Sequence, residues 1–176
     1  MLISLVRLPN DGLKFEHQYE DGELDLADRD FTLSRQVTII GRVDRVGAEM
    51  RLRGSLSASL RRPCDRCLTD VEWPLELPFD LIYVAADKDS QRSGEVELTV
   101  NDLGISVYEN DQIDLDEMVI EQLELSLPFR LLCTEDCRGL CPQCGVDLNN
   151  DKCDCQPLID PRWEALAAVK ESLEKK

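Results

Sequence analysis

Residues 50–83 read MRLRGSLSASLRRPCDRCLTDVEWPLELPFDLIY. Apolar and polar side chains alternate from Met50 to Leu60, and the alternation resumes from Val71 to Tyr83. A period of two predicts two β-strands that each bury one face. The segment between them, residues 62–68, contains the only cysteine pair in the first half of the chain. This stretch therefore predicts a long β-hairpin with two cysteines at its tip.

Further strands are predicted by short β-branched or alternating runs at residues 1–8, 37–43, 95–100 and 105–107. Pro74 and Pro78 fall on outward-facing positions of the second hairpin strand. Proline cannot donate a backbone hydrogen bond, so this strand is expected at a sheet edge or at a bulge. The acidic residues 16–30 show little pattern.

Two helices are expected late in the chain. Asp114 precedes the first, Glu117 stands three residues later as in a capping box, and Pro128 ends it. Asp160 and Pro161 mark the start of the second, because aspartate favours the cap and proline the first helical position. The first helix places these side chains along one face: Leu115, Met118, Val119, Gln122 and Leu123.

Eight cysteines divide into a pair at residues 64 and 67 and a group at residues 133–155. In a reducing compartment, paired cysteines are more often metal ligands or redox centres than structural disulfides. Two C-x-x-C turns, at residues 64–67 and 141–144, can each direct two thiolates at one Zn²⁺ ion about 2.3 Å away. All eight are therefore candidate zinc ligands: Cys64, Cys67, Cys133, Cys137, Cys141, Cys144, Cys153 and Cys155.

Eight thiolates could fill two four-ligand zinc sites. In the simplest partition one site is local and the other joins the hairpin tip to the segment after the first helix, which would close a loop of about 65 residues and add stability. In the alternative, one site draws on positions 137, 141, 144 and the 153/155 pair. Spacing does not decide between one and two ions. The two sites of the simplest partition are Cys141, Cys144, Cys153 and Cys155, and Cys64, Cys67, Cys133 and Cys137.

The chain of 176 residues has room for one domain with a small appended module. We expect an α+β fold with an antiparallel sheet, sandwich- or barrel-like, that contains the long hairpin and carries two helices. Residues 1–130 would form this β core with one helix. Residues 131–176 would form a cysteine-rich zinc module whose C-terminal helix packs on the core.

The net charge of −16 argues against a protein that grips nucleic acid over its whole surface. The charge is uneven, because residues 41–70 carry seven bases and four acids whereas residues 71–127 carry two bases and fifteen acids. No apolar run is long enough to span a membrane, and residues 1–7 do not resemble a signal peptide. A cytoplasmic location without membrane contact is expected.

The sequence favours a binding protein over an enzyme. It contains no Walker loop and no G-x-G-x-x-G, H-E-x-x-H or G-x-S-x-G motif. His17 is the only histidine and lies far along the chain from every cysteine, which disfavours a catalytic zinc with a histidine ligand. A thiol-redox centre ranks low, because its cysteine pair should open a helix after a parallel strand.

Two charged surfaces are candidate contact sites. Arginines along the hairpin could contact RNA phosphates, although Arg51 and Arg53 could equally pair with carboxylates on neighbouring strands. An acidic helix face that also includes Asp116 could contact a basic protein such as a ribosomal protein. The candidate RNA-binding residues are Arg51, Arg53, Arg61, Arg62 and Arg66. The candidate protein-binding residues are Glu117, Glu121 and Glu124.

Several motifs resemble the YceD family, the large ribosomal RNA subunit accumulation proteins. They are CDRCL at residues 64–68, IDL at 113–115, LSLP at 125–128, CRGLCPQCGVDLN at 137–149 closing on CDC at 153–155, and DPRW at 160–163 with Leu166. The resemblance extends from about residue 35 onward. It implies a cytoplasmic, non-enzymatic bacterial factor needed for accumulation of large-subunit (23S) rRNA, with cysteines as metal ligands and no catalytic residues.

The leading hypothesis is therefore a zinc-containing ribosome biogenesis factor that supports large-subunit rRNA during processing or assembly. Its expected partners are that rRNA or its precursor particles, reached directly or through a basic ribosomal protein. The first alternative is an acidic adaptor that recruits a basic protein. The second is a thiol-redox protein.

Overall fold

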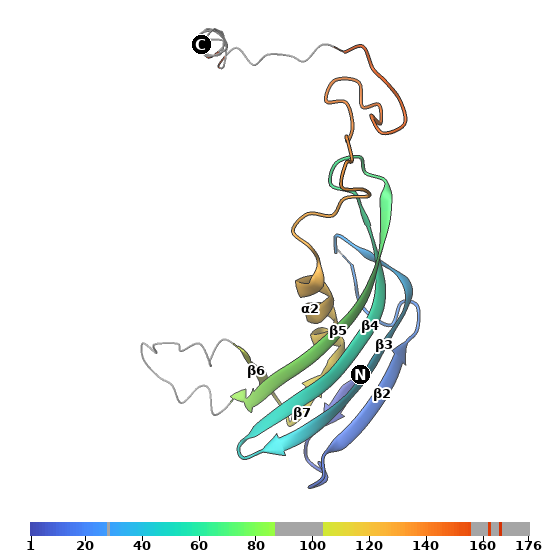
Figure 1. The fold of residues 1–176 in the computed structure, drawn as a ribbon. Coiled ribbons are helices and arrows are strands. Elements are labelled where there is room, and N and C mark those ends of the chain that lie inside the picture. The colour runs from blue at the N-terminus through green and yellow to red at the C-terminus, as the bar shows by residue number, and fades with distance from the viewer. Residues whose placement is uncertain (28, 87–103, 156–161, 163–165, 167–176) are drawn as a thin grey trace.

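The computed structural model describes residues 1–176 except 28, 87–103, 156–161, 163–165 and 167–176. Within the described residues, seven strands and one helix have defined bounds. They are β1 (Leu2–Ser4), β2 (Leu13–Tyr19), β3 (Thr32–Val46), β4 (Glu49–Pro63), β5 (Asp70–Ala85), β6 (Ile105–Tyr108), β7 (Gln112–Asp114) and α2 (Leu115–Ser126). Strands β2-β3-β4-β5-β6 form one sheet in that order, and β1 pairs with β7 in a second. The large sheet is strongly curved, and α2 lies against its concave side (Figure 1).

The long hairpin is confirmed. Strands β4 and β5 pair antiparallel from Met50 opposite Tyr83 to Pro63 opposite Asp70, with both cysteines in the connecting turn. The edge position of the prolines is also confirmed. Strand β6 pairs with β5 only at residues 82–85, so along Pro74 and Pro78 the described neighbour of β5 is β4 alone.

The fold differs from the expectation in three respects. The sheet is open rather than a closed barrel, with α2 and the β1–β7 pair contributing to one core on its inner side. Strand β6 runs parallel to β5, so the sheet is antiparallel only for the most part. Strand β2 overlaps the acidic stretch in which the sequence shows no clear alternation of apolar and polar residues. The alternation is weak because only Tyr19 of the seven β2 side chains is buried.

The described residues contain one helix of defined bounds instead of two. The expected helix beginning at Asp160 and the expected strand at 95–100 both lie outside the described residues. The first expected helix is confirmed as α2, whose N-cap Asp114 accepts hydrogen bonds from the backbone N–H groups of Asp116 and Glu117. The helix ends at Ser126, two residues before Pro128.

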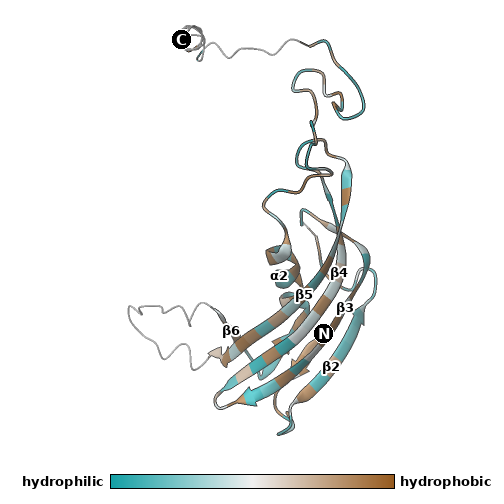
Figure 2. Cartoon of the chain, viewed as in Figure 1, coloured by the Kyte–Doolittle hydropathy of each residue, from teal (hydrophilic) through white to brown (hydrophobic). Residues whose placement is uncertain are grey.

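The core lies between the concave face of the sheet and α2. Figure 2 shows hydrophobic and hydrophilic bands alternating along β4 and β5, as the period of two predicts. Each large apolar side chain that is fully buried contributes about 1.5–3 kcal/mol. Buried members from β4 are Met50, Leu52, Leu56 and Leu60, and those from α2 are Leu115, Met118, Val119 and Leu123.

Gly41 on β3 and Gly54 on β4 lie directly opposite each other in the sheet. A Cβ atom at Gly54 would stand 2.1 Å from the Ile40 carbonyl oxygen and 2.7 Å from Phe79 Cζ, and one at Gly41 would stand 2.5 Å from Phe15 Cζ. Two phenylalanine rings therefore pack against bare backbone at this point.

Candidate metal centres and charged surfaces

The structure brings the eight cysteines together into two groups of four. Within each group all four sulfur atoms lie within 4.8 Å of one another, and all eight cysteines are free thiols. This grouping matches the simplest partition, and Cys137 belongs with the hairpin tip rather than with Cys141 and Cys144. The first centre consists of Cys64, Cys67, Cys133 and Cys137, and the second of Cys141, Cys144, Cys153 and Cys155.

Sulfur–sulfur distances in the first centre fit a tetrahedral ion. The Cys64 and Cys137 sulfurs lie 3.8 Å apart, and those of Cys67 and Cys133 lie 3.5 Å apart. Four sulfurs each about 2.3 Å from one zinc ion stand about 3.8 Å from one another. A disulfide would bring two sulfurs to about 2.05 Å. The geometry is that of four separate thiols placed where one metal ion could contact them all.

The hairpin tip forms a tight turn around the Cys64 sulfur. The backbone N–H groups of Arg66 and Cys133 donate to this sulfur at 3.5 and 3.4 Å. The Leu68 N–H donates to the Cys64 carbonyl oxygen at 3.0 Å, and Leu68 itself takes a left-handed conformation with φ of 62°. The turn thus directs backbone N–H groups at the position where a thiolate would carry its charge.

The tip is joined to the segment after α2 by backbone and side-chain hydrogen bonds. Asp65 donates through its N–H to the Leu131 carbonyl oxygen at 2.9 Å, and its Oδ2 accepts from the Leu131 N–H at 2.6 Å. Leu140 donates to the Arg66 carbonyl oxygen at 3.1 Å. Gly139 has a φ of +75°, and a Cβ there would stand 3.0 Å from that same oxygen. These contacts place Cys133 and Cys137 beside the tip.

The second centre is built on a second tight turn. The Gly145 N–H donates to the Cys141 carbonyl oxygen at 2.9 Å, and the Cys141 N–H donates to that of Val146 at 2.8 Å. Gly145 has a φ of +73°, a conformation that favours glycine over other residues, as expected for a turn of this kind. Cys153 and Cys155 complete the group from the other side of the loop.

Asn149 lies between Cys144 and Cys153 in the sequence and bonds to the first centre, and the cysteine spacing did not point to it. Its side-chain NH₂ group donates to the Cys137 sulfur of the first centre at 3.4 Å. Its side-chain oxygen accepts from the Arg138 N–H at 2.8 Å. Asp65 and Gly139 were likewise missed. Their positions could have indicated them, because Asp65 lies inside a C-x-x-C segment and Gly139 inside the CRGLC segment. Residues between clustered cysteines determine the shape of the backbone turn.

The thiols within each centre differ in how readily they ionise. Burial alone would raise the pKa of Cys64, but the N–H groups of Cys67, Arg66 and Cys133 bring it to about 6. Hydrogen bonds to Cys67 and Cys137 raise the pKa of Cys133 to about 12. The second centre repeats the pattern, because the N–H groups of Cys144 and Gln143 lower the pKa of Cys141 to about 6, and a bond to Cys144 raises that of Cys155 to about 12. A bound cation would favour ionisation of all four thiols.

The two centres differ in burial. In the first, Cys64, Cys67 and Cys137 are buried and Cys133 is half-buried. In the second, only Cys141 is buried, whereas Cys144 and Cys155 are exposed. The first centre also has its own apolar surroundings, contributed by Val71, Leu132 and Leu140.

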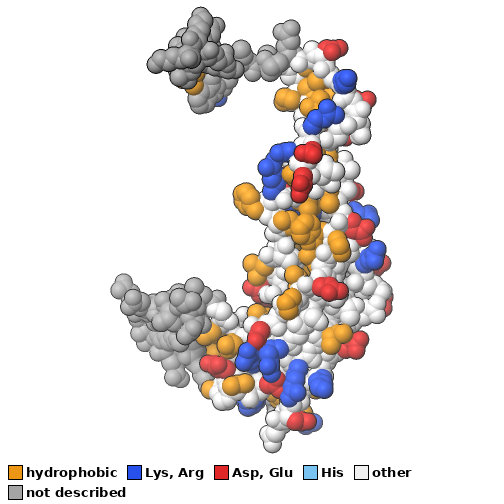
Figure 3. Space-filling model, in the orientation of Figure 1, with side chains coloured by type: hydrophobic (Ala, Val, Ile, Leu, Met, Phe, Trp, Pro, Cys, Tyr) orange, Lys and Arg blue, Asp and Glu red, His pale blue; other side chains and the backbone are white. Residues whose placement is uncertain are grey.

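The hairpin arginines are mostly engaged within the protein. Arg51 donates two hydrogen bonds to Asp80 at 2.7 and 2.5 Å, and Arg53 pairs with Asp44 at 3.0 Å, which confirms that both meet carboxylates on neighbouring strands. Figure 3 shows basic and acidic side chains next to one another over the lower part of the sheet. Nearer the tip, Arg62 pairs with Asp65 at 3.3 Å and Arg66 donates to the Cys137 carbonyl oxygen, while Arg61 lies exposed opposite Glu72.

The carboxylates of the acidic helix face differ in whether they are paired. Glu124 pairs with Arg29 at 2.7 Å, whereas Glu117 and Glu121 are exposed and form no ion pair with any described residue. Asp116 contacts the Met1 amino group and accepts a hydrogen bond from the Tyr19 hydroxyl at 2.9 Å.

His17 lies on β2 and pairs with Glu23, away from both centres. Among the described residues, no helix has the length and apolar composition that a membrane crossing requires.

Comparison with known proteins identifies the family. Residues 52–170 match the family model described as large ribosomal RNA subunit accumulation protein YceD. The chain belongs to the YceD family. The span that matches the YceD model contains both centres and most of the long hairpin, so the resemblance seen in the sequence is confirmed.

Similar proteins are found in bacteria and in a plant. An uncharacterized protein of Mycobacterium tuberculosis is 33% identical over 128 residues, which are 73% of this chain and 59% of that protein. The uncharacterized protein YlbN of Bacillus subtilis is 26% identical over 167 residues, 94% of this chain and 92% of YlbN. The Arabidopsis thaliana chloroplastic protein named large ribosomal RNA subunit accumulation protein YCED homolog 1 is 29% identical over 66 residues, 37% of this chain and 21% of that protein. The match therefore spans less than two thirds of the mycobacterial relative. No solved structure matches the chain.

Proposed function

We propose that this protein is a non-enzymatic, cytoplasmic ribosome biogenesis factor that supports accumulation of large-subunit rRNA and holds two structural zinc ions. The observation that carries the proposal is the match of residues 52–170 to a family described by large-subunit rRNA accumulation. That span includes every cysteine of both centres. The centres and the matched sequence thus belong to one unit.

The donor set favours structural zinc. Each centre offers four thiolates and no histidine, and four protein ligands leave no open position for a substrate. Soft thiolate donors select zinc or iron–sulfur clusters rather than hard cations. Zinc is favoured because both centres use tight C-x-x-C turns, which are typical of zinc knuckles. Bound zinc would hold the hairpin tip, the segment after α2 and the second turn as one rigid end of the molecule.

Contact with the ribosomal precursor through a basic protein has more support than direct RNA contact. Four of the five candidate arginines already bond to a carboxylate or a carbonyl oxygen. Breaking those pairs would offset part of what a phosphate contact contributes. Glu117 and Glu121 have no such partners among the described residues. A direct RNA contact would rely chiefly on Arg61.

Depletion and complementation in cells test the rRNA role. Cells without the protein should show a lower ratio of large- to small-subunit rRNA and fewer mature large subunits in a sucrose gradient. The wild-type gene should restore both. A Glu117→Gln/Glu121→Gln variant should restore them poorly and an Arg61→Glu variant nearly fully if a basic protein is the contact. Normal rRNA ratios after depletion would refute the proposal.

Elemental analysis of the purified protein tests the metal. We expect about two zinc ions per chain. Their removal by a strong chelator should lower the thermal stability of the protein. A folded, metal-free protein with rapidly reacting thiols would favour the thiol-redox alternative. Unchanged melting and unchanged co-sedimentation with ribosomal particles after chelation would contradict a structural role for the metal.

A further inference from the structure

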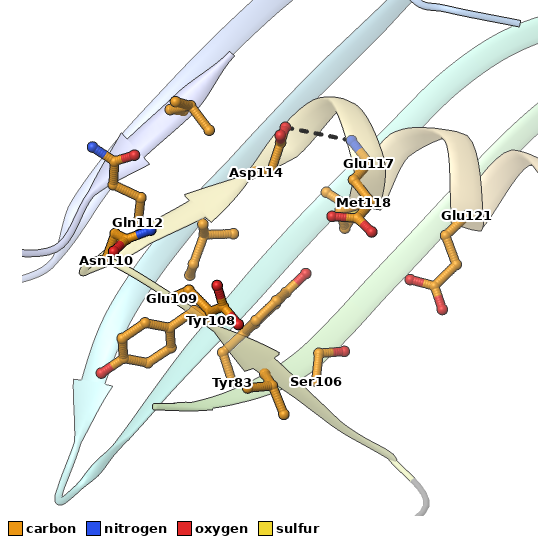
Figure 4. A pocket seen from close by; sticks show the side chains of 13 residues that line it. Tyr83, Ser106, Tyr108, Glu109, Asn110, Gln112, Asp114, Glu117, Met118 and Glu121 are labelled. Atoms are coloured by element: carbon orange, nitrogen blue, oxygen red, sulfur yellow. Dashed lines mark hydrogen bonds between the residues drawn. The ribbon is translucent and has the colours of Figure 1, made fainter. Parts of the chain in front are cut away.

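A cavity of about 590 Å³ lies at the other end of the sheet from the cysteine centres. It is open to solvent and is bounded by the end of β5, by β6 and β7, and by the first two turns of α2 (Figure 4). Apolar surface comes from the Tyr83 ring, Ile113 and Met118. The cavity therefore presents apolar surface that can contact the aliphatic part of a side chain, next to polar groups that can contact its end.

The charged residues that line this cavity are all acidic. Glu109, Asp114, Glu117 and Glu121 contribute carboxylates, and no described lysine or arginine lines it. Asp114 is already engaged in capping α2. The other three are exposed and form no ion pair with a described residue. Glu117 and Glu121 are four residues apart on one helix, a spacing at which like charges repel each other unless a cation lies between them.

The spacing of these carboxylates suits an organic cation better than a metal ion. Within the described residues, the groups of side chains close enough to share one metal ion are the two cysteine centres, and the cavity carboxylates do not form a third. The N-terminus of α2 would by itself favour an anion. That preference is offset here, because Asp114 accepts from its N–H groups and Asp116 and Glu117 follow in the first turn.

Tyr83 supplies a second, independent indication of a ligand. The residue as a whole is only 7% exposed, but its hydroxyl oxygen is accessible and has no hydrogen-bond partner among the described residues. Figure 4 shows the Tyr83 side chain pointing from β5 into the cavity towards α2. Burial, and then the charges of Glu121, Glu117 and Asp114, raise its pKa to about 12. The hydroxyl is therefore neutral in the cell, faces the cavity and can accept a hydrogen bond from a bound N–H donor.

We propose that this cavity binds a lysine or arginine side chain from a basic segment of a partner protein. The aliphatic stem packs on Met118 and the Tyr83 ring, and the cationic head lies between Glu117 and Glu121 within reach of the Tyr83 hydroxyl. The inference deepens the protein-mediated route of the proposed function and rests on it for the kind of partner. RNA is disfavoured as an occupant, because its phosphates would meet only carboxylates here.

A peptide-binding experiment on the full-length, metal-loaded protein tests this site. The probe is a fluorescent peptide in which arginines alternate with serines, measured by anisotropy at near-physiological salt. The matched probe carries citrulline, which has nearly the same shape without the charge. We expect binding of the arginine peptide and at least about tenfold weaker binding of the citrulline peptide.

Variants locate the binding. Glu117→Gln/Glu121→Gln should weaken it at least about tenfold and Tyr83→Phe about threefold. The control Glu16→Gln/Glu76→Gln removes the same number of charges from exposed positions elsewhere and should weaken it less than about twofold. Equal weakening by both double variants would show general charge attraction and overturn the proposal.

Methyl NMR provides a readout at the cavity itself. The chain has three methionines, of which Met118 lines the cavity and Met50 is fully buried in the sheet. The Met118 methyl signal should shift on peptide addition while that of Met50 stays in place. A stationary Met118 signal, or the same shift caused by an RNA oligonucleotide, would refute the proposal. Neither result affects the rRNA ratio measured after depletion, so the two proposals can fail separately.

Discussion

Asp65 illustrates how a residue other than the cysteines can help to build a candidate metal centre. Its backbone N–H and its carboxylate both bond to Leu131, and the same carboxylate pairs with Arg62. The C-x-x-C spacing predicts that Cys64 and Cys67 share an ion. It does not predict that Asp65, between them, bonds to the segment that supplies the other two ligands, because that contact joins residues 66 positions apart.

At Gly54, substitution by alanine should lower the free energy of unfolding by about 2–4 kcal/mol. The added methyl group would clash with the Ile40 carbonyl oxygen and with Gly41, which are backbone atoms that cannot turn aside. Guanidinium unfolding measures the change. Gly104→Ala is the control, because a Cβ there meets nothing within 4 Å, and it should change the free energy by less than about 0.5 kcal/mol. Equal effects of the two variants would contradict this account of the glycine pair.

Tyr83 should make the fold less stable at alkaline pH. Its pKa is about 12 in the folded protein against 10.0 ordinarily, so above pH 10 the unfolded chain releases a proton that the folded chain keeps. The contribution of Tyr83 to the free energy of unfolding is therefore complete below pH 10. It falls by about 1.4 kcal/mol per pH unit as the pH rises from 10 to 12. Tyr83→Phe should remove that part of the slope, measured by urea unfolding at several pH values.

The comparison with Tyr19→Phe provides the control. The Tyr19 hydroxyl donates to Asp116, so its removal should cost about 1 kcal/mol even at pH 8, whereas Tyr83→Phe removes no hydrogen bond to a described residue and should change stability little there. Burial and Asp116 also hold the pKa of Tyr19 well above its ordinary value. An alkaline slope that is identical in wild type and both variants would show that neither tyrosine is responsible.

At the scale of elements, the hairpin tip and the segment after α2 act together. The tip supplies two cysteines of the first centre, and the later segment supplies the other two together with the backbone bonds to Asp65 and Arg66. The first centre therefore spans the predicted boundary between residues 1–130 and 131–176. The second centre, in contrast, is built within residues 141–155 and has exposed thiols.

Metal should leave the two centres in a fixed order. We expect a chelator or a thiol reagent to release one zinc ion quickly from the second centre, where Cys144 and Cys155 are exposed, and the other slowly from the buried first centre. A colorimetric zinc indicator measures the two phases. Cys144→Ser should abolish the fast phase and leave the slow phase intact. Release in a single phase, or loss of the slow phase in that variant, would contradict the assignment.

At the scale of the whole molecule, the proposed ion in the first centre would cross-link distant parts of the chain. Two of the centre's sulfur pairs, 3.5 and 3.8 Å apart, join residues 66 and 73 positions apart in the chain. A cross-link of that span lowers the entropy of the unfolded chain, which is worth about 4 kcal/mol in the loop-closure model used for disulfides. The second centre closes only a short local loop and should contribute little to the stability of the sheet.

Cys133→Ser should therefore lower the free energy of unfolding of the sheet by about 3–4 kcal/mol, and Cys155→Ser by less than about 1 kcal/mol. Trp73 on β5 packs against the core and reports unfolding by fluorescence. A Trp163→Phe background leaves it as the single tryptophan. Similar losses in the two variants would show that the centres do not differ as cross-links.

The sequence by itself determined the hairpin, its cysteine tip, the capped helix and the eight thiols, because each depends on residues close together in the chain. Periodicity and turn chemistry are local properties that can be recognised in one segment. Only the tertiary structure decided which four cysteines share a centre, that Arg51 and Arg53 meet Asp80 and Asp44, and that β6 runs parallel to β5. It also placed Tyr83 opposite Glu117 and Glu121. These features depend on contacts between residues distant along the chain, and the packing of the whole fold selects such contacts among many alternatives of similar local energy.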